Sequence, residues 1–405
     1  MVIDSVEIGG FANIRDVKVG LDDVTALIAP NGYGKSNVLR ALAFGSRFIG
    51  ASETERERMM AQENVMPINR SMLRQDFSME ICGKSGDVWF EYGFSFRWTV
   101  DERKGAVTGE WLRMKQEERK FRQAMLRKAE DEFLYLSSPT GRCSNLERVA
   151  GCQLALQKMA QDESLFFAEM VKDVAGTTFP QLDTLDNPEV YFSADSTKGI
   201  ELLGELTLSG YLFRLKEQNP MAYNVLEDGI RQLVPHVTRF EPREIVLADG
   251  RTRLYDIVVE ERNSAYPTSV RQMSSGSKRM VLLLTLCVAA REKGLPLLMI
   301  EEPENSVHPR LLENLLLALH DYAGETKVLL TSHSPYLMRH MRACQMYFGL
   351  PADDDVARFA RLKEGKVRTV SKFASAMELT VGEYMFDFML DLEQEREKVV
   401  SFFEV

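Results

Sequence analysis

The sequence predicts an α/β fold in which a glycine loop joins a buried strand to a helix. Three observations predict it. The apolar run 24–29 ends in a glycine-rich segment, a helical pattern follows over 38–48, and two later apolar runs, 297–300 and 328–330, end in polar residues. Strand, glycine loop and helix form the context that a phosphate-binding loop requires. In an open parallel sheet, ligands bind where such strands end.

The remaining chain divides into three parts by pattern. Residues 2–8 and 13–19 alternate as strands, and 77–98 reads as a hairpin turned at 83–86. From 115 to 233 the spacing is close to 3.6 and charged residues abound, which predicts a mainly helical insertion. Strand character returns over 237–259, with a break at 248–250. We therefore expect an amino-terminal part over 1–114, a mainly helical insertion over 115–235 and a carboxy-terminal part over 236–405.

Composition sets further bounds. The 405 residues are 45% hydrophobic, enough for a large core, and the net charge of -10 argues against a surface that binds polyanions over its whole area. No apolar run is long enough to span a bilayer and the amino terminus lacks a signal-peptide pattern, so we expect a soluble, cytoplasmic protein. Five widely spaced cysteines predict free thiols: Cys82, Cys143, Cys152, Cys287 and Cys344.

The glycine loop has the residue types that a triphosphate requires. Its small residues let backbone N–H groups approach phosphate oxygens, Lys35 can reach the outer phosphates, and the Ser36 hydroxyl can bind Mg²⁺. Ala29 stands where the usual loop has its first glycine. The full set of expected loop ligands is Asn31, Gly32, Tyr33, Gly34, Lys35, Ser36 and Asn37.

Two other strand ends carry candidate catalytic groups. Glu301 and Glu302 follow the run 297–300, and we predict Glu301 as the metal-side acid and Glu302 as the general base that polarises water. Where many such strands have aspartate, Glu301 reaches about one methylene further. His333 closes the run 328–330 and can donate a hydrogen bond to a γ-phosphate. A lone histidine is more often structural, but this one follows a strand expected beside the Glu301 strand.

A serine loop precedes the predicted helix over 279–292. Ser274 and Gly276 place hydroxyl and backbone N–H groups at the positive end of that helix, which makes a second phosphate site, although a serine-capped helix start is the plain reading of the loop alone. One triphosphate cannot use two distant loops unless the chain folds back or a second copy supplies one of them.

Together these motifs resemble the branch of the ABC ATPases that contains SMC, RecF and overcoming-lysogenisation-defect (OLD) proteins. The motifs are Pro30-Asn31-Gly32-x-Gly34-Lys35-Ser36-Asn37, Ser274-x-Gly276-x-Lys278, Glu301-Glu302-Pro303-Glu304 and Ser332-His333-Ser334-Pro335. The resemblance implies a P-loop NTPase head with a mixed-sheet lobe and a helical lobe, ATP and Mg²⁺ as ligands, and a head-to-tail homodimer or higher oligomer. In it, Ser274, Gly276 and Lys278 cap the γ-phosphate of the partner subunit.

The spacing between motifs narrows the resemblance. Ser36 and Ser274 are too far apart for a transporter subunit, the insertion lacks the heptads of an SMC arm, and no acidic cluster marks a Toprim nuclease. The chain is most similar to stand-alone ATPases of bacterial anti-phage systems, RloA-like and PtuA-like, which act with a separately encoded nuclease or toxin. For the glutamine that reports on Mg²⁺ in this family, Gln75 is the weak candidate and Gln62 the other.

Alternatives remain open at the level of function. The Ala29 and Glu301 departures leave room for an ATP-dependent scaffold that hydrolyses little and sequesters a toxin or nuclease, and a small-molecule kinase is a weaker third reading. Nucleic acid is a further partner if basic residues of 113–132 line a cleft, although interleaved acids favour a solvated helix face there. The basic residues of that cleft are Arg113, Lys115, Arg119, Lys120, Arg122 and Arg127.

Overall fold

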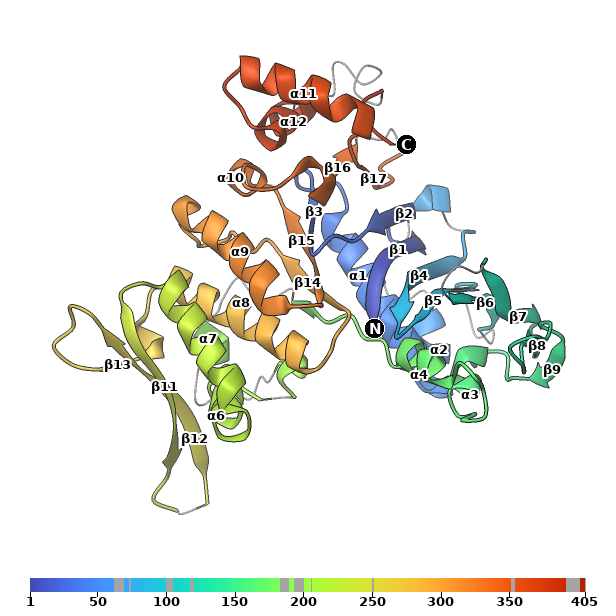
Figure 1. Cartoon of the computed structure of the whole chain (residues 1–405), viewed down its shortest axis with the longest axis horizontal. Coiled ribbons are helices and arrows are strands. Elements are labelled where there is room, and N and C mark those ends of the chain that lie inside the picture. The colour runs from blue at the N-terminus through green and yellow to red at the C-terminus, as the bar shows by residue number, and fades with distance from the viewer. Residues whose placement is uncertain are drawn as a thin grey trace.

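A parallel sheet lies at the centre of the protein, between an antiparallel lobe and a helical lobe (Figure 1). The structure is a computed structural model of the whole chain. The residues that it describes are 1–61, 69–72, 74–99, 105–116, 120–182, 189–192, 200–204, 206–249, 251–350, 354–390 and 401–404.

The central sheet has the strand order β10-β14-β15-β3-β16-β17, and every pairing except β16 with β17 is parallel. Its strands are β10 (Gln181–Leu182), β14 (Leu297–Glu301), β15 (Lys327–Ser332), β3 (Val24–Ile28), β16 (Met346–Leu350) and β17 (Arg358–Ala360). Strand β3, which leads into the glycine loop, pairs with β15, and β15 pairs with β14. All three strand ends with candidate groups therefore meet at one edge, as predicted.

An antiparallel sheet forms the second layer, in the order β2-β1-β4-β5-β6-β7-β8-β9. Its strands are β1 (Val2–Phe11), β2 (Ile14–Gly20), β4 (Phe77–Ser85), β5 (Val88–Phe96), β6 (Val107–Gln116), β7 (Arg122–Ala129), β8 (Glu132–Tyr135) and β9 (Asn145–Arg148). The predicted hairpin over 77–98 is confirmed as β4 and β5. Helix α1 (Lys35–Gly50) packs close against it, and a Cβ on Gly45 would lie 2.2 Å from the Met79 sulfur.

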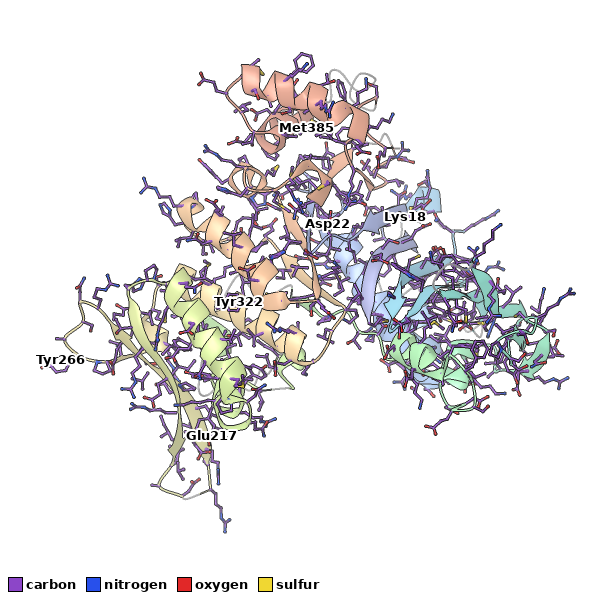
Figure 2. The ribbon with its side chains drawn as sticks, in the orientation of Figure 1. Lys18, Asp22, Glu217, Tyr266, Tyr322 and Met385 are labelled. Carbon is purple, nitrogen blue, oxygen red and sulfur yellow. The ribbon has the colours of Figure 1, made fainter. Side chains whose placement is uncertain are left out.

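The remaining elements build the helical lobe and the carboxy-terminal end. A long hairpin of β11 (Val237–Val246) and β12 (Arg253–Glu261), with β13 (Thr268–Ser269), projects from the lobe, and the exposed Tyr266 stands at its far margin (Figure 2). The helices and 3₁₀ turns other than α1 are α2 (Glu53–Met60), η2 (Arg70–Met72), α3 (Ala155–Met159), α4 (Ala168–Ala175), α5 (Glu189–Phe192), η3 (Glu201–Leu203), α6 (Leu208–Gln218), α7 (Pro220–Leu233), η4 (Val270–Gln272), α8 (Ser275–Glu292), η5 (Pro309–Leu311), α9 (Leu312–Ala323), α10 (Pro335–Met338), η6 (Ala343–Gln345), α11 (Glu364–Ala376) and α12 (Val381–Leu390). In the part of the chain described, no helix is long and apolar enough to cross a membrane.

Strand β14 lies between the two hydrophobic cores, and its side chains point alternately into one core and the other. Leu297 and Met299 face the core shared with α1 and the antiparallel sheet, whereas Leu298 and Ile300 face the core of α8 and α9. Because all four side chains are fully buried, β14 is an apolar run without polar alternation. Each such side chain contributes roughly 2 kcal/mol by burial, which fixes the strand end where Glu301 begins the polar segment.

The prediction of a mainly helical segment from 115 is wrong for its first third. The antiparallel sheet runs through residue 115, and residues 122–148 form β7, β8 and β9, so that the sheet continues past the expected boundary at 114. Helices α3 to α7 then occupy much of 155–233, as predicted.

In the charged segment 113–132, the described residues 113–116 and 122–129 are likewise strand rather than helix. Leu112 and Met114 are fully buried on one face of β6. On the other face, Arg113 pairs with Glu91 at 2.7 Å and the Lys115 ammonium lies 5.2 Å from the centroid of the Trp89 ring. The charged residues lie on the solvent-facing side of a strand and so recur every second residue. The many Lys and Arg residues made this period of two hard to recognise in the sequence.

Candidate active site

The glycine loop connects β3 to α1 and is shaped by two left-handed glycines. Gly32 has φ 86° and Gly34 φ 91°, conformations that other residues adopt at a cost. At Gly34 a Cβ would also lie 2.8 Å from the Ala357 Cβ and 2.9 Å from the Asn13 amide oxygen. Only glycine fits there, so the loop geometry is built into the sequence.

Lys35 lies almost buried beneath this loop. Its ammonium donates to the carbonyl oxygens of Ala29 at 2.6 Å and Pro30 at 3.1 Å. Burial lowers the pKa of Lys35, while the charges of Glu302, Glu304 and Glu301 oppose that shift. A buried cation facing acidic strand ends is well placed to meet the negative charge of a phosphate.

The alanine in place of the first loop glycine has a structural compensation. Ala29 is fully buried, and its methyl group lies where β16 has Gly349; a Cβ on Gly349 would come within 2.6 Å of the Ala29 Cβ. Because Gly349 has no side chain, the Ala29 methyl group can occupy the space between the two strands. Ala29 therefore leaves the loop conformation intact.

Glu302 and His333, at the ends of β14 and β15, are hydrogen-bonded to each other. The Oε1 of Glu302 is 2.9 Å from the Nδ1 of His333, and its Oε2 accepts from the Asn305 amide at 3.0 Å. Burial alone would raise the pKa of Glu302, but these two hydrogen bonds, with the charges of His333 and Lys35, hold that pKa below its usual range. The carboxylate is ionised at neutral pH, as a general base must be.

The backbone at Glu302 is itself unusual. Its φ of 43° places a residue with a side chain in the left-handed region, at a cost on the order of 1–3 kcal/mol. Its N–H donates to the Thr331 carbonyl at 3.0 Å, which continues the β14–β15 ladder by one residue. The turn directs the Glu302 side chain toward His333 rather than along the strand.

Glu304 forms the buried floor of the same segment. Its Oε1 accepts from the Ser332 hydroxyl at 2.5 Å, and its Oε2 has no hydrogen-bond partner among the described atoms. Burial raises the pKa of Glu304. Sequence reasoning gave Glu304 no role, although its position two residues after the predicted base was a usable signal.

Glu301, the predicted metal-side acid, has a partner that sequence reasoning missed. Gln181, on β10 beside β14, donates its side-chain amide to the Oε1 of Glu301 at 3.0 Å. Gln75 instead donates to the backbone carbonyl of Arg15, so its side chain supports the loop before β4 rather than the acidic strand ends. The other candidate, Gln62, lies outside the described residues.

Three further loop residues differ in their placement. Asn31 is exposed, while the amide of Asn37 donates to the Asn13 side chain at 2.8 Å. Tyr33 is half-buried, near Gly349. Asn37 thus anchors α1 to the segment between β1 and β2, a structural role that the sequence did not indicate. Ser36, which is half-buried in the first turn of α1, stays the predicted Mg²⁺ ligand.

The serine loop lies at the start of α8, where Ser274 caps the helix. Its hydroxyl accepts from the Ser277 backbone N–H at 3.2 Å, and its side chain is exposed. Gly276 packs on the segment after β14, because a Cβ there would lie 2.6 Å from the Ser306 carbonyl oxygen. Lys278 is only 2% exposed, so its side chain faces the interior and its predicted contact with a partner's phosphate is not supported by this placement.

Arg279 ties the serine helix to the acidic strand end. The side chain is 1% exposed, and its guanidinium donates to the carbonyl oxygens of Pro303 at 3.2 Å and Glu302 at 2.5 Å. A planar group with several donors suits adjacent carbonyls. The positions of the serine loop and of the Glu302 turn are therefore mechanically linked within one chain.

The basic cleft expected over 113–127 is not formed as a unit. Arg127 is buried and its guanidinium lies 3.9 Å from Glu110, so it is withdrawn from solvent. Arg113 is paired with Glu91, and Arg119 lies outside the described residues. What the structure retains at this surface is a small group of cations over aromatic rings.

Comparison with known proteins agrees with part of this picture. A family model matches residues 193–339. It is described as "AAA domain, putative AbiEii toxin, Type IV TA system", and its range includes Ser274, Glu302 and His333 but not the glycine loop. No curated protein matches the chain.

SMC heads are among the solved structures that match this chain. The SMC head bound to the C-terminal winged-helix domain of ScpA matches with 14% identity and a TM-score of 0.49, covering 90% of this chain and 99% of that one. The SMC head of Thermotoga maritima matches with 14% identity and a TM-score of 0.42, over 90% and 100%. The Pyrococcus furiosus SMC head bound to a ScpA domain matches with 13% identity and a TM-score of 0.43, over 92% and 99%.

The fold class itself rests on the strand order and the loop. A glycine loop between β3 and α1, with β15 between β3 and the acidic strand β14, makes this an α/β P-loop NTPase fold, and the predicted fold class is confirmed. The residues present fit a nucleotide with Mg²⁺: a Cβ on Gly32 would meet nothing within 4 Å, which leaves room beside the loop, and Lys35 supplies a nearly buried cation to the same loop.

Proposed function

We propose that the chain binds Mg-ATP at the glycine loop and hydrolyses it, with Glu302 as the general base. The observation that carries this proposal is the Glu302–His333 hydrogen bond at the ends of adjacent parallel strands, next to the strand that leads into Lys35. A small-molecule kinase needs neither the Ser274-x-Gly276 loop nor His333.

In the proposed reaction the chain positions the phosphate and forms no covalent bond to it. Lys35, the loop N–H groups and Ser36 hold the triphosphate, Glu301 with Ser36 holds the metal, and Glu302 takes a proton from the attacking water. Bound Mg²⁺ supplies charge neutralisation at the β- and γ-phosphate oxygens. Within the described residues no three side chains of His, Cys, Asp or Glu form a metal cage, in keeping with a metal held largely by phosphate and water.

His333 acts on Glu302 first. An ionised carboxylate can only accept hydrogen bonds, so the His333 Nδ1 carries the proton at the 2.9 Å contact. A second donation from Nε2 to a γ-phosphate, as predicted, then requires the doubly protonated ring. We infer that His333 orients the base through Nδ1 in the resting chain.

The test is ATP turnover by Glu302→Gln. The amide keeps the shape but has one acceptor oxygen in place of two and cannot accept a proton, so turnover is expected to fall about 100-fold or more while ATP binding persists. Turnover is followed by phosphate release and binding by calorimetry. Equal turnover in the wild type and the variant contradicts the assignment of the base. Negligible turnover in the wild type itself favours the scaffold reading.

We further propose that two copies close head to tail, so that Ser274 and Gly276 of one cap the ATP of the other. The exposure of Ser274 supports this, because it leaves the start of α8 accessible to a second copy. We also propose a role beside a separately encoded effector in anti-phage defence, which rests on the motif resemblance; the family that matches residues 193–339 is itself described as a putative toxin of a type IV toxin–antitoxin system. Plaque counts on cells that carry this chain with its neighbouring genes, wild type against Glu302→Gln, test that role.

A further inference from the structure

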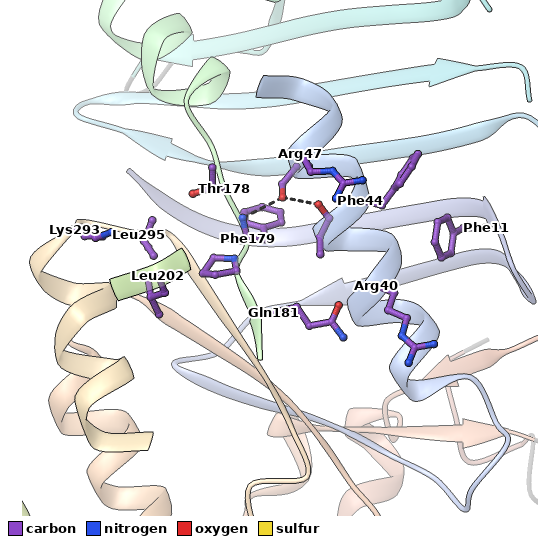
Figure 3. A pocket seen from close by; sticks show the side chains of 13 residues that line it. Phe11, Arg40, Phe44, Arg47, Thr178, Phe179, Gln181, Leu202, Lys293 and Leu295 are labelled. Atoms are coloured by element: carbon purple, nitrogen blue, oxygen red, sulfur yellow. Dashed lines mark hydrogen bonds between the residues drawn. The ribbon is translucent and has the colours of Figure 1, made fainter. Parts of the chain in front are cut away.

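A cavity of about 560 Å³ opens between the glycine-loop helix and the helical lobe. Helix α1 forms one wall and the end of α8 with the following turn forms the other. Figure 3 shows Arg40 and Arg47 along α1, Lys293 on the opposite side, and Gln181 between them. The volume falls within the range that small-molecule ligands occupy.

The charge of this cavity is one-sided. Arg40, Arg47 and Lys293 line it, and none of its lining residues in the described chain is acidic. All three side chains are exposed, and none makes an ion pair or side-chain hydrogen bond in the described structure. Three cations without counter-charges in a chain of net charge -10 concentrate positive potential at one place.

The helix dipole gives a structural reason for the position of only one of these cations. Arg47 lies in the last turn of α1, where a cation complements the negative helix end. Arg40 lies mid-helix, where that effect has decayed, and Lys293 belongs to the other lobe. The apolar side chains of Phe179 and Leu295 also line the cavity, but Phe179 is only 2% exposed, so Leu295 supplies most of the apolar surface.

We propose that this cavity binds a phosphate-bearing ligand through Arg40, Arg47 and Lys293, at a site separate from the glycine loop. The shared chemistry is the phosphate group, carried either by a nucleic-acid strand or by a free polyphosphate. Two guanidiniums seven residues apart lie on one helix face, about 10 Å apart along the axis, and their long side chains can converge on one phosphate-bearing ligand, while Lys293 closes the site from the other lobe.

A single residue connects the cavity to the predicted metal-side acid, Glu301. Gln181 lines it and also donates to Glu301 at 3.0 Å. A ligand that draws α1 and α8 together therefore acts on the residue that orients Glu301. This coupling rests on the proposed ATPase, whereas binding in the cavity does not.

The binding experiment uses the full chain with a non-hydrolysable ATP analogue filling the glycine loop. The probes are a fluorescein-labelled thymidine 12-mer and inorganic tripolyphosphate, and the test variant is the triple Arg40→Gln, Arg47→Gln, Lys293→Gln. The variant is expected to bind the probe at least about tenfold more weakly. Its salt slope for the 12-mer should be shallower by roughly 2, since each lost phosphate contact on a single strand removes about 0.7.

The matched control removes the same charge elsewhere. Arg142, Arg368 and Lys372 are exposed cations without ion pairs in the described structure, and their triple change to Gln should leave affinity near that of the wild type. Binding of the 12-mer identifies a nucleic-acid strand, and binding of tripolyphosphate alone identifies a free polyphosphate. Equal affinity in the two triple variants, or binding of neither probe by the wild type, overturns the proposal.

Coupling is measured in the Glu302→Gln background, so that hydrolysis does not enter. The probe that binds should change the dissociation constant of ATP by about fivefold or more, the lower end of typical coupling between sites. An unchanged ATP affinity at saturating probe contradicts the coupling. Because this readout needs no turnover, its failure is distinct from a failure of the proposed ATPase.

Discussion

At the scale of single residues, the site depends on side chains that hold other side chains. Gln181 holds Glu301, while Asn305 and His333 hold Glu302. These holding contacts restrict the acids to defined orientations before any ligand arrives, which lowers the reorganisation needed in the reaction.

Gln181→Ala is expected to raise the Mg²⁺ concentration for half-maximal ATP turnover by about tenfold, because groups behind a metal ligand typically affect metal affinity by that factor. A Mg²⁺ titration of turnover measures it. The control is Gln75→Ala, the glutamine that the sequence favoured and whose amide lies on the Arg15 carbonyl. A shift in the Gln75 variant without one in the Gln181 variant reverses the assignment.

At the scale of elements, α8 and the turn after β14 behave as one piece. Arg279 spans from the helix to the carbonyls of Glu302 and Pro303, and Gly276 lies against Ser306. A movement of the serine loop is therefore transmitted to the base. In a dimer, the loop that meets one ATP would report to the base that acts on the other.

Arg279→Lys should destabilise the chain by about 1–3 kcal/mol, because a single ammonium leaves buried carbonyls unsatisfied. Turnover should fall as well, since the Glu302 turn loses its support. Urea unfolding followed by circular dichroism gives the stability change. Arg291→Lys, an exposed position near the other end of α8, is the matched control. Equal unfolding curves for the two variants would show that the hydrogen bonds of Arg279 do not contribute to stability in this way.

The elements also show where sequence reasoning succeeds. The glycine loop, the Glu302 segment and His333 were predictable because each signal is contained in a few adjacent residues. Gln181 was not, because its contact with Glu301 depends on β10 pairing with β14 across 120 positions of sequence. Strands β6 to β9 were missed because their solvent face is charged, and stacking of Lys115 over Trp89 and Phe121 is a tertiary feature.

At the scale of the whole molecule, the proposed closure of two copies predicts ATP-dependent dimers. Glu302→Gln should accumulate a dimer with Mg-ATP, and adding Ser274→Arg should return it to monomer, because the longer side chain enters the interface. Light scattering after gel filtration measures the mass.

The control for the dimer experiment is Ser52→Arg in the same Glu302→Gln chain. Ser52 caps α2 through its hydroxyl, as Ser274 caps α8, so both changes cost a similar cap of roughly 1 kcal/mol. Only the Ser274 change should remove the dimer. A dimer that survives Ser274→Arg contradicts the head-to-tail arrangement.

The position of β3 has a consequence for how the protein is made. This strand, complete at residue 28, is paired on both edges by β15 and β16, which end at residues 332 and 350. On the ribosome the glycine loop therefore emerges long before its neighbours, with five apolar or buried positions of β3 unpaired. The nascent chain must carry an unpaired β3 and an unfinished glycine-loop site through most of its synthesis, the period when an unpaired strand edge is most prone to aggregate.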